Sequence, residues 1–155
     1  MLINKKISIR KVQKKDVDFL YDLENDIKLW KVSQTKQKFT KKEISDFVYN
    51  ARFDIAITSQ VRFIIDLDNK SIGCIDLYDY NFMKNQAGVG IVVIEDYRRN
   101  GYAKQALEQL IFYSWNKIFI KKLYALIDSE NIASIKLFLS LGFQLSIKNK
   151  YVLCK

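Results

Sequence analysis

Residues 87–104, with the sequence AGVGIVVIEDYRRNGYAK, constrain the fold more than any other stretch of this chain. The first half is apolar and β-branched, which is typical of a buried strand. A turn with Arg98, Arg99 and Gly101 follows, and from Ala103 onward apolar residues recur at helical spacing. This succession predicts an anion site, because the first turn of a helix carries free backbone N–H groups and partial positive charge. The turn alone also fits an ordinary loop whose basic residues are solvated.

The two standard nucleotide-binding patterns are missing from the sequence. It contains no G-x-x-x-x-G-K-[ST], and Gly88-Val89-Gly90 does not extend to G-x-G-x-x-G because residue 93 is a valine. We therefore expect an anion site that is built differently from a P-loop or a Rossmann site.

Two motifs together resemble the GNAT family of N-acetyltransferases. Arg98-x-x-Gly101-x-Ala103 is similar to the family's pyrophosphate-binding motif, [QR]-x-x-G-x-[GA]. A second segment follows in the expected order and spacing and is similar to the family's N-x-x-[AS]-x-x-[LI]-[YF]-x-x-x-G-F: Asn131-x-x-Ser134-x-x-Leu137-Phe138-x-x-x-Gly142-Phe143. The resemblance covers residues 60–147 well and residues 1–59 in outline. Within the family, the residue pattern of the strands and loops looks closest to the branch of ribosomal-protein and polyamine acetyltransferases.

Periodicity and turn residues predict a single domain over residues 1–155, with an α+β fold. The expected strands are 7–12, 61–67, 71–80, 87–94, 122–128, 143–147 and 150–154, and the expected helices are 15–30, 40–53, 102–118 and 132–141. The sheet is expected to be mostly antiparallel, with 87–94 and 122–128 parallel and joined by a crossover helix. The resemblance implies the acyl-CoA N-acyltransferase fold, a three-layer sandwich with four helices on both faces of about seven strands. In that fold the two parallel strands splay apart around the pantetheine arm of the cofactor.

The resemblance also implies acetyl-CoA as co-substrate and gives each segment a role. Backbone groups of residues 91–93 would pair with the pantetheine amides, and N–H groups of residues 99–104 would hold the pyrophosphate. The expected cofactor-binding residues are Ile91, Val92, Val93, Arg98, Arg99, Asn100, Gly101, Tyr102, Ala103, Lys104, Asn131, Ser134, Lys136 and Phe138. Asn131 fits a plain helix N-cap equally well, and Ser134 a surface position of a helix.

Acetyl transfer to an amine requires a proton acceptor for the amine and a backbone donor for the oxyanion. Asp76 is the preferred general base, and an ordinary outward-facing strand aspartate is the alternative interpretation. Asp79 and Asp128 are further candidates. The N–H of Val92 or Val93 is the candidate oxyanion donor.

The departing thiolate needs stabilisation or a proton, and here the chain departs from its relatives. Many of them carry a tyrosine, their usual general acid, where this chain has Phe138. Ser134, Tyr151, Tyr124 or water would have to replace that hydroxyl. A glutamate common in the polyamine branch is replaced by Gly88.

Composition removes several other classes of function. The chain has no histidine, which excludes Ser-His, Cys-His and His-metal mechanisms, and we expect no metal. Its net charge of +9 is spread over the sequence, so we expect no nucleic-acid partner. With no apolar run of membrane-spanning length and no signal-peptide core in MLINKKISIR, we expect no membrane partner and a cytoplasmic location.

The leading hypothesis is an acetyl-CoA-dependent N-acetyltransferase that works by direct attack of a primary amine in a ternary complex. The acceptor is a protein N-terminus or a polyamine or other small amine. Acidic residues such as Asp66 and Asp79 favour a polyamine, whereas Ser33-Gln34-Thr35 replaces an acidic cluster of the spermidine enzymes. The alternative is a CoA-binding module without catalysis. A homodimer is compatible with the resemblance.

Overall fold

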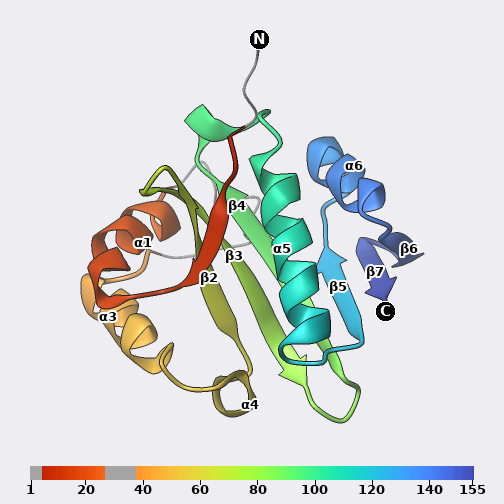
Figure 1. The fold of residues 1–155 in the computed structure, drawn as a ribbon, viewed down its shortest axis with the longest axis horizontal. Coiled ribbons are helices and arrows are strands. Elements are labelled where there is room, and N and C mark those ends of the chain that lie inside the picture. Colours follow the sequence, from red (N-terminus) through yellow and green to blue (C-terminus); the bar gives the residue numbers. More distant parts are fainter. Residues whose placement is uncertain (1–4, 27–37) are drawn as a thin grey trace.

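The structure is a computed structural model that describes residues 5–26 and 38–155 (Figure 1). Its seven strands form one sheet in the order β1-β2-β3-β4-β5-β7-β6. The strands are β1 (Ser8–Lys11), β2 (Val61–Leu67), β3 (Lys70–Asn81), β4 (Gln86–Val93), β5 (Lys122–Leu126), β6 (Gln144–Ile147) and β7 (Lys150–Cys154). All neighbours are antiparallel except β4 and β5. The mixed α+β sheet predicted from the sequence is therefore confirmed.

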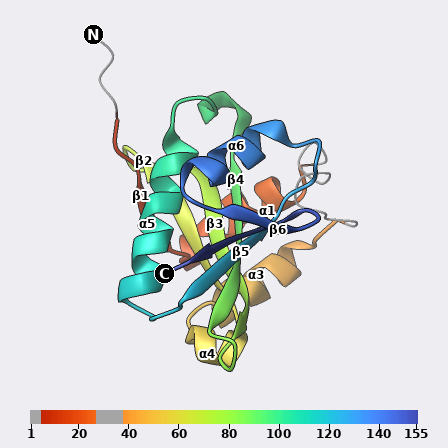
Figure 2. The same cartoon turned by 90° about the vertical axis from the view of Figure 1, so that its right-hand side faces the viewer.

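Helices cover both faces of this sheet. They are η1 (Lys14–Asp16), α1 (Val17–Glu24), α3 (Lys41–Asn50), α4 (Ile55–Thr58), η2 (Glu95–Tyr97), α5 (Tyr102–Asn116) and α6 (Ile132–Ser140). Figure 2 shows α5 on one side of the sheet and α1 and α3 on the other. Leu20 of α1 and Ile44 of α3 pack on Ile64 of β2, while Leu107 and Leu110 of α5 pack in the larger cluster around Ile75 and Leu77 of β3. Alternate residues of β2 and β3 thus supply two separate cores.

The parallel strands β4 and β5 pair only at their beginnings. The paired residues are Gln86 with Lys122, Ala87 with Leu123, and Gly88 with Tyr124. Beyond Gly88, β4 continues to Val93 with β3 as its only strand partner among the described residues, and β5 turns to β7. The splayed pair implied by the resemblance is therefore present, with its vertex at Gly88 and Tyr124.

The outer edge of β1 is covered by two glutamines of α5. Gln109 accepts a hydrogen bond from the Ile9 N–H at 3.2 Å and donates to the Ile7 carbonyl at 2.9 Å. Gln105 accepts from the Ile7 N–H at 3.0 Å. These amides satisfy backbone groups that an uncovered edge strand would present to other chains.

Three details differ from the sequence prediction. The expected helix 40–53 ends at Asn50, and the short α4 follows it, so the described residues hold five α-helices instead of four. The first helix opens with the 3-10 turn η1. The expected helix 15–30 ends at Glu24, since Asn25 and Asp26 are described and are not helical. Trp30 and the Ser33-Gln34-Thr35 segment lie outside the described residues. Among the described helices, none is long and apolar enough to cross a membrane.

Candidate functional site

The turn between β4 and α5 presents a row of backbone N–H groups. Arg99 and Gly101 have positive φ angles of 65° and 79°, and Gly101 is the N-cap of α5. A Cβ at position 101 would meet no atom of residues 5–26 and 38–155 within 4 Å, so these residues leave the space beside Gly101 open. Within the described part of the chain, no backbone acceptor takes the N–H groups of residues 99–104. Six neighbouring donors at a helix N-terminus can bind an anion such as a pyrophosphate.

Side chains hold this turn in place. The Arg98 Nε donates to the Val93 carbonyl at 2.9 Å, which ties the turn to the last residue of β4. The Asn100 side-chain amide donates to the Arg98 carbonyl at 3.0 Å. Arg99 and Lys104 are exposed, whereas Tyr102 and Ala103 are half-buried. Two expected anion-binding residues, Arg98 and Asn100, thus also shape the turn.

The edge of β4 that faces the gap exposes alternate backbone groups. The Ile94 N–H donates to the Ile72 carbonyl of β3 at 2.8 Å, so every second residue before Ile94 also turns its N–H and C=O to β3. Val92 belongs to that set, while the amides of Ile91 and Val93 are directed to the gap. The register therefore argues against Val92 as an oxyanion donor and favours Ile91 and Val93 for the pantetheine, although both roles stay predictions.

The second motif places its residues on α6. Asn131 caps the helix by accepting a hydrogen bond from the Ser134 N–H at 3.2 Å, as the alternative interpretation anticipated. Lys136 is exposed. Phe138 is only 2% exposed and packs edge-on against Phe143, with ring centroids 4.9 Å apart. This packing leaves little of the Phe138 ring for a cofactor, and its expected contact with acetyl-CoA stays a prediction.

Asp76, the preferred base, is held by Arg62. Two hydrogen bonds of 2.7 Å join the guanidinium to both carboxylate oxygens, and Arg62 also pairs with Glu24 of α1. Burial alone would lower the pKa of Arg62, but the two carboxylates raise it well above its usual value. Because both oxygens of Asp76 are occupied, the geometry favours a structural partner over a proton acceptor. The sequence predicted the hairpin in which Arg62 and Asp76 face each other, but not the addition of the distant Glu24.

The three candidate catalytic side chains do not converge in this structure. Asp76 lies on the face covered by α1 and α3, as the pairing with Arg62 and Glu24 shows. Tyr151, which is 8% exposed, belongs to the core cluster on the face of α5. Ser134 is half-buried on α6. Their catalytic roles remain predictions.

Cys74 is a buried thiol beneath α1. It packs with Leu23, and burial raises its pKa to about 12. Such a thiol stays protonated near neutral pH and is a poor nucleophile. Cys154, the other cysteine, is exposed.

Tyr78 occupies the vertex of the splay. The sequence suggested Tyr78 for the acceptor pocket but did not predict this position. Its ring lies against Gly88, where a Cβ would come within 2.5 Å of the Tyr78 Cζ. The same ring meets Tyr124 edge-on, with centroids 6.1 Å apart. Burial raises the pKa of Tyr78 to about 12, and the charges of Tyr124 and Asp79 add to this shift. The glycine was the available signal, because glycine inside a strand often marks a close approach.

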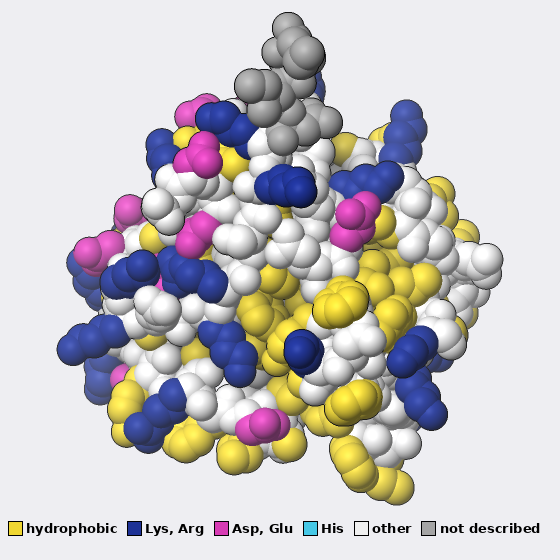
Figure 3. All heavy atoms as spheres, in the orientation of Figure 1, with side chains coloured by type: hydrophobic (Ala, Val, Ile, Leu, Met, Phe, Trp, Pro, Cys, Tyr) yellow, Lys and Arg dark blue, Asp and Glu magenta, His cyan; other side chains and the backbone are white. Residues whose placement is uncertain are grey.

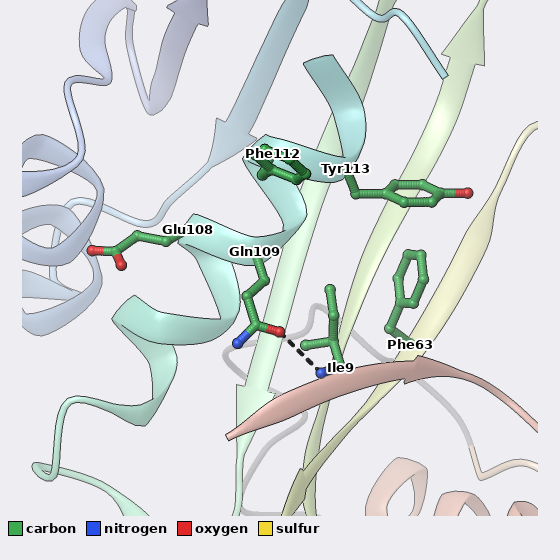
Figure 4. A pocket seen from close by; sticks show the side chains of 6 residues that line it. All are labelled: Ile9, Phe63, Glu108, Gln109, Phe112 and Tyr113. Carbon is green, nitrogen blue, oxygen red and sulfur yellow. Dashed lines mark hydrogen bonds between the residues drawn. The ribbon is translucent and has the colours of Figure 1, made fainter. Parts of the chain in front are cut away.

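A separate pocket of about 410 Å³ lies between α5, β1 and β2 (Figure 4). It is lined by Ile9, Phe63, Glu108, Gln109, Phe112 and Tyr113. This pocket is at the opposite edge of the sheet from β6 and β7, and it includes none of the expected site residues. Lysine and arginine side chains are scattered over the same face of the molecule and form no single stripe (Figure 3).

Comparison with known proteins gives one family and a consistent set of relatives. Residues 6–144 match the model of the Acetyltransferase (GNAT) domain. The chain is 23% identical over 137 residues to spermidine N(1)-acetyltransferase of Escherichia coli K12, covering 88% of this chain and 72% of that protein. It is 25% identical over 143 residues to the uncharacterized N-acetyltransferase YnaD of Bacillus subtilis, covering 92% of this chain and 82% of that protein. The chain superposes on the crystal structure of Vibrio cholerae spermidine N-acetyltransferase in complex with CoA and spermine with a TM-score of 0.84 at 16% identity. The superposition covers 96% of this chain and 95% of that chain.

Proposed function

Because the chain belongs to the GNAT acetyltransferase family and is an N-acetyltransferase, we propose that it transfers the acetyl group of acetyl-CoA to a primary amine of a linear polyamine. The amine attacks the thioester carbonyl directly, the carbon–sulfur bond breaks, and the CoA thiolate leaves. The observation that carries this proposal is the row of free N–H groups at residues 99–104, next to the open edge of β4. The row of N–H groups fits a pyrophosphate, and the open edge of β4 fits an extended arm that contains amides.

The buried state of Cys74 supports direct transfer. An acetyl-cysteine intermediate would need a thiolate, and the raised pKa of Cys74 together with the absence of histidine provides no route to one at this position. The amine therefore attacks without a covalent enzyme intermediate. Because Arg62 occupies the Asp76 carboxylate, we assign removal of the amine proton to solvent water.

The acceptor assignment has two supports. Relatives along most of the chain are named spermidine acetyltransferases. In this chain, the vertex of the splay carries two tyrosines, and the charge of Asp79 raises the pKa of both of them, after burial as the main cause. Aromatic rings beside a carboxylate suit a cationic amine better than an anionic or apolar acceptor.

Thiol release in the presence of acetyl-CoA tests the proposal. The acceptor panel is spermidine, spermine, short peptides with free N-termini and an aminoglycoside. We expect release with spermidine or spermine. Release only with the peptides would assign the acceptor to a protein N-terminus. No release with any acceptor, despite a rise in melting temperature with acetyl-CoA, would favour a CoA-binding module.

A further inference from the structure

The vertex between β4 and β5 carries a pair of tyrosines, Tyr78 and Tyr124. Tyr78 of β3, Gly88 of β4 and Tyr124 of β5 are in register across three adjacent strands. Because Gly88 has no side chain, the Tyr78 ring lies on the β4 backbone and reaches Tyr124, at an interplanar angle of 79°. Any larger residue at position 88 would push the ring away.

One ring of this pair already faces an ammonium group. The Lys150 Nζ lies over the Tyr124 ring, 4.8 Å from its centroid. This is within the range at which a cation is attracted to an aromatic face. Lys150 comes from β7, outside the vertex, so a ligand ammonium could take the same place without disturbing the sheet.

The polar surroundings of Tyr78 suit a cation as well. Within the described residues, the Tyr78 hydroxyl has no hydrogen-bond partner. Every buried side-chain polar atom among these residues does have one, so the Tyr78 hydroxyl is not buried and solvent reaches it. Asp79 follows Tyr78 directly in the chain, and its charge raises the pKa of both tyrosines in addition to the effect of burial. Asp76 also contributes to the Tyr78 shift, but Arg62 balances its charge.

Open space runs along β4 from the tyrosine pair toward Ile91, where the pantetheine arm is expected. Among the described residues, the face of β4 above Gly90 is open, since a Cβ there would meet only the Tyr78 Cε1, at 3.8 Å. From Gly88 to Ile91, whose amide faces the gap, the strand runs for about 10 Å at its usual rise per residue. An extended amine chain can lie along this stretch.

We propose that Tyr78, Tyr124 and Asp79 form a binding site for the second ammonium group of a linear polyamine, the one that is not acetylated. The inference rests on the proposed function for its substrate class. The ammonium lies on the aromatic faces, and its N–H groups donate to the Tyr78 hydroxyl and the Asp79 carboxylate. Lys150 competes with the ligand for Tyr124.

Equilibrium binding of spermidine to the CoA complex tests this site by titration calorimetry, with propylamine as a ligand that lacks a second ammonium. Loss of the ring in Tyr124→Leu should weaken spermidine binding roughly five- to tenfold, given the usual strength of cation–π contacts. Propylamine binding should not change. Tyr124→Phe keeps the aromatic face and should bind spermidine nearly as tightly as the wild type.

Lys150→Met gives a test that leaves the tyrosines intact. It should tighten spermidine binding about threefold or more by freeing the Tyr124 face, whereas the control Lys148→Met removes an equal charge from the exposed β6–β7 turn and should have a smaller effect. Equal effects of the two lysine variants, unchanged affinity in Tyr124→Leu, or no spermidine binding by the wild type would overturn the site. Thiol release is measured separately from binding. If the variants change spermidine binding but no thiol is released, the proposed function is refuted and the site is not. If thiol is released and these variants leave its release unchanged, the site alone is refuted.

Discussion

Arg62 on β2 holds Asp76 on β3 through two parallel hydrogen bonds, Nε to Oδ1 and Nη2 to Oδ2, each 2.7 Å long. The same guanidinium pairs with Glu24 of α1 and lies over the Phe47 ring of α3, 4.9 Å from its centroid. One side chain therefore joins two strands to both helices of this face. A carboxylate that the sequence suggested as a base is part of the scaffold.

Replacement of Asp76 by asparagine should therefore act on stability first. The variant leaves Arg62, whose side chain is only 17% exposed, with one carboxylate partner, and we expect the free energy of unfolding to fall by about 3 kcal/mol. Urea denaturation measures this, and the exposed Asp79→Asn serves as the control for loss of a neighbouring charge. If Asp76 were the base, the pH–rate profile of the folded variant would flatten below about pH 8. The structure predicts a profile of unchanged shape.

The two thiols should differ sharply in reactivity. Because Cys74 is buried with its pKa raised to about 12, and Cys154 is exposed, a thiol reagent at pH 8 should modify Cys154 alone in the folded protein. Titration of the urea-unfolded protein with the same reagent should then detect both thiols. Cys74→Ala should retain turnover, since no acetyl-cysteine is formed. Loss of all turnover in a folded Cys74→Ala protein would contradict direct transfer.

The ion pair between Arg10 and Asp16 should make stability depend on pH in the acid range. Two hydrogen bonds of 2.8 Å from Arg10, together with one from the Gln13 N–H, outweigh burial and lower the pKa of Asp16. A lowered folded-state pKa means that the stabilisation is complete above the usual aspartate pKa of about 4 and is lost as pH falls through the folded value. Asp16→Asn should therefore have a lower free energy of unfolding than the wild type at pH 7, and this difference should be much smaller at pH 2. The exposed Asp18→Asn is the control, and an equal difference at both pH values would argue against the pair.

The glutamines that cover β1 should contribute measurably to stability. Gln109→Ala removes two hydrogen bonds to the edge of β1, and we expect the free energy of unfolding to fall by about 1–2 kcal/mol. Gln60→Ala changes an exposed glutamine outside the helices and strands and should have almost no effect. Comparison by urea denaturation checks both. Equal stability of the two variants would show that the edge does not depend on α5.

Local chemistry allowed much of the fold to be predicted from the sequence. The β2 boundaries match the predicted strand 61–67. Thr40 and Glu43 form a capping box at the start of the predicted helix 40–53, with the Glu43 N–H donating to the Thr40 Oγ1 at 3.1 Å. The β2–β3 turn follows from Asp68 and Asn69, whose φ angles of 49° and 65° suit a two-residue hairpin. In contrast, α4 has only four residues, too few to show helical periodicity.

Contacts between distant segments explain what the sequence left out. Arg62 and Asp76 lie opposite each other across the β2–β3 hairpin. Glu24 is 38 residues from Arg62, so only the packing of α1 on the sheet adds it to this pair. The Tyr78 position likewise depends on Gly88 of the next strand. The anion site was accessible to sequence interpretation because residues 98–104 form it from one continuous segment.

Binding of acetyl-CoA to Gly101→Asp tests the central claim, that residues 99–104 hold the pyrophosphate, most directly. The new carboxylate would lie beside the phosphates, and calorimetry should show roughly tenfold or greater loss of affinity. Ser59→Asp adds the same charge at a residue with a similar φ angle of 61° and is the matched control. The account predicts wild-type affinity for Ser59→Asp and weak binding for a folded Gly101→Asp. Wild-type affinity in both variants would contradict it.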